Sequence, residues 1–102
     1  MTVAVGKYEF EGPYASADHL EDRAGVYLIV DSVGSNYVGI DCGESATVRS
    51  RVENHDRRPC WEYQRSGTLM VAVLYTPDLP SAGRAKIEHA VRGALRFPCG
   101  QR

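Results

Sequence analysis

Arg51 and His55 have the residue types and the spacing of a site that handles phosphate. They stand four residues apart in the segment RVENH, so on a helix both side chains lie on one face. Arginine presents a planar fork of donors that matches phosphate oxygens. Histidine can position or exchange a proton near neutral pH. The same pair also fits an ordinary solvated helix face, because this spacing is common by chance.

A glutamate and two tyrosines add groups for the same chemistry. Glu88 lies at the edge of an apolar helical stripe, and a lone carboxylate suits Mg²⁺, which keeps several of its waters. The competing interpretation is an ion pair with Arg84 or Arg92, each four residues away. Tyr27 belongs to the tripeptide GVY, and Tyr37 belongs to YVG, ten residues further on. A tyrosine serves as a general base only where positive charge lowers its pKa from about 10.

These groups are together the parts needed for phosphodiester cleavage. That reaction requires an activated water, a cation at the leaving oxygen, and positive charge on the transition state. The two tyrosines, taken alone, are also consistent with packing between neighbouring strands.

The strands that must position the tyrosines follow from the hydrophobic pattern. The segments GVYLIV (25–30) and NYVGID (36–41) are rich in β-branched and aromatic residues. Turn-forming residues lie between them in DSVGSN, which predicts a β-hairpin. If Tyr27 sits opposite Tyr37, the turn is centred near Ser32 and both rings lie on one face of the sheet.

Helices and further strands complete a small mixed domain. Residues 45–55 predict a helix that is capped by Ser45 and turns Val48 and Val52 inward. Residues 68–76 predict a buried strand, and residues 81–97 predict a second amphipathic helix. Residues 56–67 predict a loop with a helical turn, and residues 3–12 have the composition of an additional N-terminal strand. This order indicates an α+β fold in which helices pack on a small sheet.

The bulk composition is that of one soluble globular domain over residues 1–102. No apolar run reaches the length of a membrane span, and the N-terminus does not resemble a signal peptide. The net charge is −1, but the two halves of the chain differ in charge. Residues 1–48 contain eight acidic and two basic residues, and residues 49–102 contain five acidic and ten basic residues. This asymmetry can produce a basic face, or it can simply scatter over a solvated surface.

The three cysteines are Cys42, Cys60 and Cys99, an odd number at wide spacing. This pattern argues against a disulfide framework and predicts a reducing compartment, hence a cytoplasmic location. The chain has no CxxC motif and no His/Cys pair at ligand spacing, so a zinc site is not indicated.

The order of these motifs resembles that of the GIY-YIG nuclease family. GVY is followed by YVG, then by an arginine four residues before a histidine, a hydrophobic strand and a glutamate in a late helix. The resemblance covers roughly residues 24–96. It implies a three-stranded antiparallel sheet flanked by helices, and cleavage of DNA that depends on Mg²⁺ or Mn²⁺ in a single site.

By motif position, the resemblance also implies a role for each residue. Tyr27 and Tyr37 would be the paired tyrosines, with Tyr27 as the first choice for the base that activates water. Arg51 would hold and neutralise the scissile phosphate, and His55 would assist in positioning or proton transfer. Glu88 would bind the metal ion.

Other arginines are expected at the nucleic acid, and one assignment stays open. Arg49, Arg57 and Arg58 are expected to contact DNA. Arg49 also competes for the role of Arg51, which is preferred because it keeps the four-residue step to His55. Many family members carry a late asparagine, and here the nearest polar amide is Gln101.

Two alternatives of another class accompany the nuclease hypothesis. One is a module on the same fold that binds nucleic acid or a protein partner without catalysis, because a fold does not establish an activity. The other is an interaction domain that presents Trp61 and Tyr63 as an anchor, although both rings can equally cover the core. The form of the nucleic acid stays open, and sequence specificity is expected from the small domain itself, from a second copy or from a protein partner.

Overall fold

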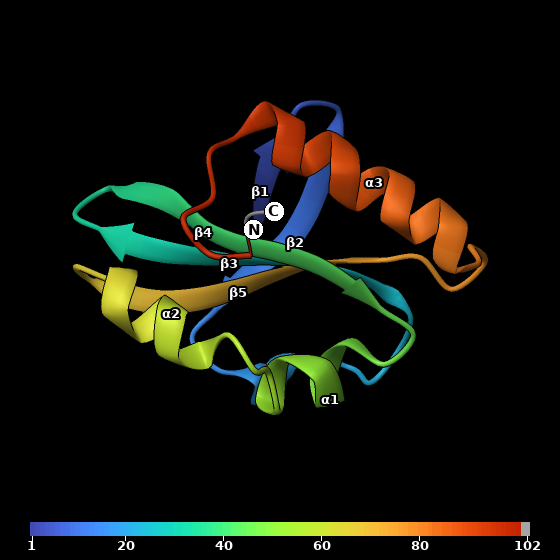
Figure 1. The fold of residues 1–102 in the computed structure, drawn as a ribbon, viewed down its shortest axis with the longest axis horizontal. Coiled ribbons are helices and arrows are strands. Elements are labelled where there is room, and N and C mark those ends of the chain that lie inside the picture. Colours follow the sequence, from blue (N-terminus) through green and yellow to red (C-terminus); the bar gives the residue numbers. More distant parts are fainter. Residues whose placement is uncertain (101–102) are drawn as a thin grey trace.

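A computed structural model describes residues 1–100 as an antiparallel sheet with helices on both faces. Figure 1 shows α3 on one side of the sheet and α1 and α2 on the other. The strands are β1 (Thr2–Val5), β2 (Tyr8–Tyr14), β3 (Gly25–Val33), β4 (Asn36–Ser45) and β5 (Thr68–Tyr75). The helices are a short 3₁₀ turn η1 (Ala17–His19), α1 (Val48–Glu53), α2 (Arg58–Gln64) and α3 (Ser81–Ala94).

The fold is α+β as expected, but the sheet has five strands in the order β1-β2-β5-β3-β4, whereas three strands and one additional N-terminal strand were predicted. Strands β5, β3 and β4 correspond to the predicted strands, with β3 in the middle. The other two strands form an N-terminal hairpin that pairs with the free side of β5. The segment 3–12 is not one strand because Gly6, with φ of 59°, turns the chain back on itself.

The expected register of the β3–β4 hairpin was wrong. The turn is formed by the two residues between Val33 and Asn36, so Tyr27 pairs with Gly43 and Tyr37 pairs with Ser32. The two strands also change register between Ile29 and Val30, where a bulge adds one residue to β4. The two tyrosines are therefore far apart along the hairpin.

The two tyrosines also lie on opposite faces of the sheet. Tyr27 belongs to the core cluster under α1 and α2. Gly39, two residues from Tyr37 and thus on the same face as it, lies against Phe97 in the other cluster. The bulge is the physical reason, because one extra residue in β4 inverts the alternation of side chains on either side of it.

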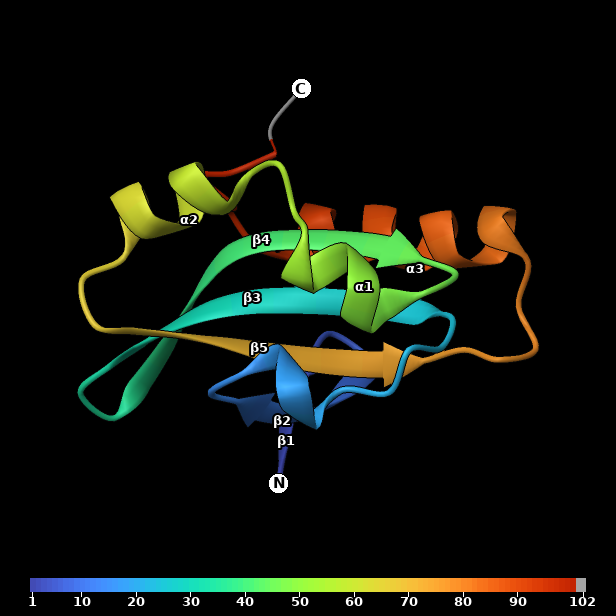
Figure 2. The ribbon, with the colours of Figure 1, turned by 90° about the horizontal axis from the view of Figure 1, so that it is seen from below.

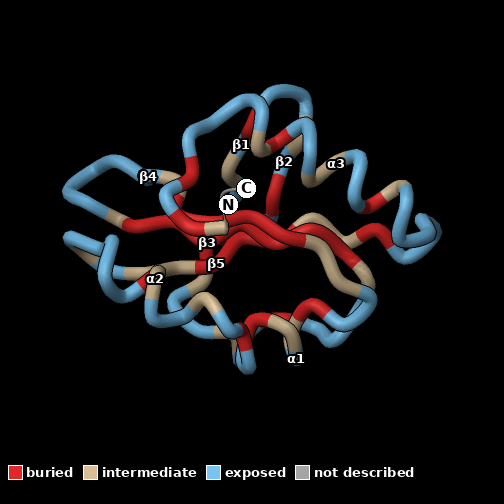
Figure 3. The backbone as a smooth tube through the Cα atoms, viewed as in Figure 1, coloured by how far each residue is buried: buried red, intermediate tan, exposed pale blue. Residues whose placement is uncertain are grey.

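Two apolar clusters hold the helices to the sheet, and the buried segments concentrate in its central strands (Figure 3). The first cluster lies under α1 and α2 and includes Ile29, Ile40, Val48, Val52, Trp61, Val71 and Val73. The second lies under α3 and includes Val26, Leu28, Val30, Ala72, Val91 and Phe97. Residues of β3 alternate between the two clusters, as expected for a strand covered on both faces. Figure 2 shows the structure from below, with β1 and β2 at the opposite edge of the sheet from β4.

The helices agree with the sequence pattern in their inward faces and differ at their starts. Val48 and Val52 are buried as predicted, but α1 begins after Thr47, because the hydroxyl of Ser45 accepts the Thr47 N–H at the end of β4. Residues 58–64 form the helix α2, in place of a loop with a single turn. Pro59 does not break α2 because it lies in the first turn, where its missing N–H removes no helical hydrogen bond.

The prediction that the cysteines stay unpaired was wrong. Cys60 of α2 forms a disulfide with Cys99, and Cys42 is free and buried. Residues 95–100, here called the C-terminal strap, follow α3 and pass along the outer edge of β4 toward α2 (Figure 1). The N–H of Cys99 donates to the carbonyl of Ile40 in β4 at 3.1 Å. Among residues 1–100, the structure contains no helix that is long and apolar enough to cross a membrane.

Candidate active site at the edge of β4

Tyr27 and His55, two of the five residues predicted for catalysis, are in direct contact beside β4, and Arg51 and Glu88 lie within electrostatic reach of Tyr27. Tyr27 comes from β3, Arg51 from α1, His55 from the segment after α1, and Glu88 from α3. Tyr27 and His55 are joined by a buried hydrogen bond of 2.6 Å between Oη and Nε2. The charges of Arg51 and Glu88 both act on the pKa of Tyr27, so helices from opposite faces of the sheet bring charge to one hydroxyl.

The hydroxyl of Tyr27 lies directly over the backbone of Gly43. A Cβ at position 43 would be 2.1 Å from the Tyr27 oxygen, a distance that no pair of side chains tolerates. Glycine is therefore required at this position in β4 for the ring of Tyr27 to lie flat against the strand. The Tyr27 side chain is only 1% exposed, which places it in the core as well as in the site.

The hydrogen bonds of His55 define its tautomer. The N–H of Arg57 donates to Nδ1 of His55 at 3.0 Å, so Nδ1 carries no proton. In the neutral ring the proton is then on Nε2, which donates to the oxygen of Tyr27. The Tyr27 hydroxyl is thereby left to donate its own hydrogen to another acceptor.

Burial is the main cause of the pKa shifts of Tyr27 and His55. Burial raises the pKa of Tyr27 to about 12, and the nearby guanidinium groups of Arg51 and Arg57 do not reverse this shift. The condition for a tyrosine base, a pKa lowered by positive charge, is therefore not met at Tyr27, because desolvation outweighs the charges. Burial also lowers the pKa of His55 to about 4, and the charges of Arg51 and Arg57 act in the same direction. Both side chains are thus neutral near pH 7.

The neutral state of His55 should make stability depend on pH. Its pKa is about 4 in the folded chain against an ordinary 6.5, so the unfolded chain binds this proton at higher pH. The stabilisation is fully present above about pH 6.5 and is lost as the pH falls toward about 4, by about 3 kcal/mol in total. Urea unfolding across this range should show the decline. His55→Gln should remove most of it, and the exposed His89→Gln should leave it unchanged.

Arg51 is held by an exposed ion pair, so its charge can be redirected to a ligand. Its Nη2 lies 2.9 Å from the carboxylate of Asp56, and the two side chains are 38% and 72% exposed. An exposed pair of this kind contributes little to stability, so Arg51 can exchange its partner for a phosphate at small cost. Arg49 forms ion pairs with Asp18 of η1 and with Glu53 of its own helix, α1.

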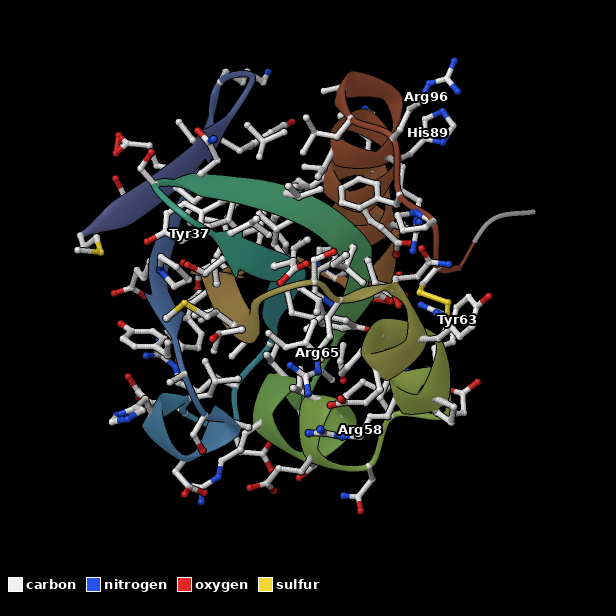
Figure 4. All side chains as sticks on the ribbon, turned by 90° about the vertical axis from the view of Figure 1, so that its left-hand side faces the viewer. Tyr37, Arg58, Tyr63, Arg65, His89 and Arg96 are labelled. Carbon is white, nitrogen blue, oxygen red and sulfur yellow. A yellow bond between two sulfur atoms is a disulfide. The ribbon has the colours of Figure 1, made fainter. Side chains whose placement is uncertain are left out.

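Glu88 lines a cavity of about 600 Å³ between α3 and the C-terminal strap. Its carboxylate accepts from Nε of Arg92 at 3.2 Å, which is one of the two ion pairs that the sequence allowed. His89 and Arg96 also line this cavity, and Figure 4 shows both side chains pointing away from the body of the protein beside α3. Among residues 1–100, no group of three or more His, Cys, Asp or Glu side chains is placed to hold a metal ion.

Asp41 is the residue that links the two halves of the site, and it was not among the residues predicted from the sequence. It is fully buried in β4 and accepts hydrogen bonds from Arg57 at 2.8 Å, Trp61 at 2.7 Å and Arg92 at 2.6 Å. Burial would raise the pKa of Asp41, but these donors together outweigh burial and hold it below its usual range. An acid within an otherwise apolar strand segment was the available signal.

Asp41 connects Glu88 to His55 through its two arginines. Arg92 bridges Asp41 to Glu88 and also donates to the carbonyl of Cys42 in β4. Arg57 binds the carboxylate of Asp41 through its side chain and donates its backbone N–H to His55. The positions of the metal-binding candidate and of the Tyr27–His55 pair therefore depend on one buried carboxylate.

The remaining predicted residues lie elsewhere or are engaged. Tyr37 is 46% exposed near the tip of the β3–β4 hairpin and takes no part in the cluster around Tyr27 (Figure 4). Arg58 donates to the carbonyl of Val52, and its guanidinium lies over the ring of Trp61. Gln101 lies outside the described residues.

The aromatic pair near α2 is divided between the core and the surface. Trp61 is 2% exposed and belongs to the core under α1 and α2, whereas Tyr63 is 86% exposed beside the disulfide (Figure 4). An anchor made of both rings, one of the alternatives raised by the sequence, is therefore not present.

No family model, no curated protein and no solved structure matches this chain.

Proposed function

We propose that this protein is a divalent-metal-dependent nuclease of the GIY-YIG type, which hydrolyses phosphodiester bonds in DNA. The observation that carries the proposal is the hydrogen-bonded Tyr27–His55 pair, which stands within electrostatic reach of Arg51 and Glu88. The central strand order β5-β3-β4, with GVY at the start of the middle strand, agrees with the three-stranded core that this family would require.

Glu88 fits the proposed Mg²⁺ or Mn²⁺ ion through the chemistry of its donor and the room beside it. A single carboxylate suits a hard cation that keeps most of its waters, and the cavity of about 600 Å³ is large enough for a hydrated ion. When bound, the ion would polarise a phosphoryl oxygen and lower the pKa of a bound water. Arg92, which already binds Glu88, would hold the carboxylate in place.

The protein's own side chains divide the remaining work. Arg51 would release Asp56 and bind the scissile phosphate with its guanidinium fork. Tyr27 would enter as a neutral hydroxyl, because its pKa of about 12 excludes a phenolate near neutral pH. With its oxygen accepting from His55, Tyr27 can donate its hydrogen to a phosphate oxygen or orient a water. His55 is thus a positioning residue in this proposal.

A nicking assay on supercoiled plasmid tests the proposal. The wild-type protein should nick the plasmid with Mg²⁺ or Mn²⁺ and should not do so with EDTA. Glu88→Gln keeps the shape of the side chain and should lose at least about a hundredfold in rate, the scale of a lost electrostatic group in a site. Glu62→Gln, on exposed α2, is the matched control and should retain activity.

The assay should be run with and without a dithiol, and on duplex, branched and single-stranded DNA. Equal nicking by wild type and Glu88→Gln would overturn the metal assignment. The absence of metal-dependent cleavage on every substrate would overturn the nuclease itself. Because the net charge is only −1, we expect weak binding that fades with salt, so specificity would come from a partner or a second copy.

One observation favours the second candidate, a non-catalytic module that binds nucleic acid or a protein. Tyr27 is buried, and the Glu88 carboxylate is already neutralised by Arg92, as in a purely structural cluster. Such a module would bind DNA equally well with Mg²⁺ and with EDTA, and Glu88→Gln would leave binding unchanged.

A further inference from the structure

The C-terminal strap lies between the two halves of the site, which are the Glu88 side and the Tyr27–His55 side. A Cβ at Gly100 would lie 2.6 Å from Arg92, 2.8 Å from Asp41 and 3.0 Å from Arg57. Arg92 comes from α3 and Arg57 from the start of α2, so the strap is packed between the Glu88 side and the His55 side. A phosphate that reached both sides along the edge of β4 would meet the strap first.

The strap also forms a wall of the cavity at Glu88. Leu95, Arg96, Phe97 and Gly100 line one side of that cavity, and Glu88 and Arg92 line the other. The width of the opening at Glu88 therefore depends on where the strap lies.

The end of the strap is held by hydrogen bonds, by the buried side chain of Cys99 and by one covalent bond. Cys99 donates its N–H to Ile40 at 3.1 Å and accepts from Nη1 of Arg92 at 3.3 Å. The Cys60–Cys99 disulfide ties the same residue to α2. The sulfur of Cys60 belongs to a half-buried residue, whereas Cys99 is 1% exposed, so a reductant would approach from the Cys60 side.

We propose that the Cys60–Cys99 disulfide is a thiol-operated latch, which closes the strap over the cavity at Glu88 when oxidised and releases it when reduced. The latch rests on the proposed function only for its effect on activity. The movement of the strap is a separate claim, which can be tested whatever the site does.

The chemistry of opening is a thiol–disulfide exchange with a dithiol. One thiolate of the dithiol attacks Sγ of Cys60, breaks the S–S bond and expels Cys99 as a thiolate, which takes up a proton. The second thiolate then displaces Cys60, so the dithiol leaves as a cyclic disulfide. Two electrons and two protons pass to the protein, which ends with two thiols.

Trypsin gives a direct measure of the strap. The Arg96–Phe97 bond lies within the strap, and Phe97 is 4% exposed in the core under α3, so the oxidised protein should resist cleavage there. Dithiothreitol should raise the rate of cleavage at Arg96 severalfold. Cleavage after Arg84, which is buried in α3, requires global unfolding, so in the reduced protein it should remain much slower than cleavage at Arg96.

Two variants separate the latch from other effects of the reductant. Cys60→Ser should be cleaved quickly at Arg96 with or without dithiothreitol. Cys42→Ala keeps the disulfide and should respond to dithiothreitol as the wild type does. Equal resistance at Arg96 in the oxidised and reduced wild type would overturn the latch. Equal rates of cleavage at Arg96 and Arg84 in the reduced protein would also overturn it, because the strap would then open only when the whole domain unfolds.

The nicking assay distinguishes a failure of the latch from a failure of the proposed function. The reduced protein should nick plasmid faster than the oxidised protein, and Cys60→Ser should match the reduced protein. If the strap opens but neither form nicks, the latch stands and the nuclease is wrong. If both forms nick equally while the strap opens, the latch does not control the site, and its proposed role over Glu88 is overturned.

Discussion

Asp41→Ala should lower the free energy of unfolding by about 3–5 kcal/mol, the usual loss when one member of a buried ion cluster is removed. The carboxylate is fully buried and accepts from Arg57, Trp61 and Arg92. Its removal would leave two guanidinium groups without their shared counter-ion in a poorly solvated place. Urea denaturation at neutral pH measures the loss directly.

Two further variants show whether burial and charge are the cause. Asp41→Asn keeps the size of the side chain but not its charge, and it should lose a large part of the same free energy. Asp56→Ala also removes an acid that is paired with an arginine, but Asp56 lies at the surface, so little change is expected. Similar losses for Asp41→Ala and Asp56→Ala would contradict the account of Asp41 as the link between the two halves of the site.

Cys60→Ser should cost about 4 kcal/mol, the second-largest effect on stability. The disulfide joins residues 39 apart in sequence, and closing a loop of this length restricts the unfolded chain by about that amount. The wild type unfolded in the presence of a dithiol should show the same stability as the variant, which checks that the bond rather than the serine is responsible. Unfolding midpoints that coincide for the oxidised wild type and the variant would contradict the prediction.

The hairpin, the buried strand β5 and the helix α3 were predictable because each has a local signal. Turn residues separate two β-rich segments, residues 68–75 form a near-continuous apolar run, and Val91 repeats on the helical face of Ile87. The register of the hairpin was not predictable, because the bulge near Val30 depends on how β4 meets the core and leaves no mark in the local sequence. To predict both β1 and β2, Gly6 had to be interpreted as a turn within a segment that looks like one strand.

The spatial grouping of the candidate residues was predictable in part from the sequence. The spacing of Arg51 and His55, together with Glu88 in a late helix, placed three residues that the fold does bring near Tyr27. Tyr37 was misplaced, because its face of the sheet follows from the bulge. The direction of the Tyr27 pKa shift was also beyond the sequence, because it depends on how deeply the ring is buried. The disulfide shows the same limit, since pairing Cys60 with Cys99 requires the path of the chain after α3.

The strap has a consequence for how separate copies of this protein behave toward each other. An uncovered edge strand offers unpaired backbone groups to any other strand, and β4 is a long strand at one border of the sheet. The N–H of Cys99 donates to the carbonyl of Ile40, so the strap shields this border of the sheet. The opposite border is formed by the short strand β1. Protein in which the strap is released from β4 should therefore self-associate by pairing of edge strands. Protein in which the strap stays bound to β4 should remain monomeric.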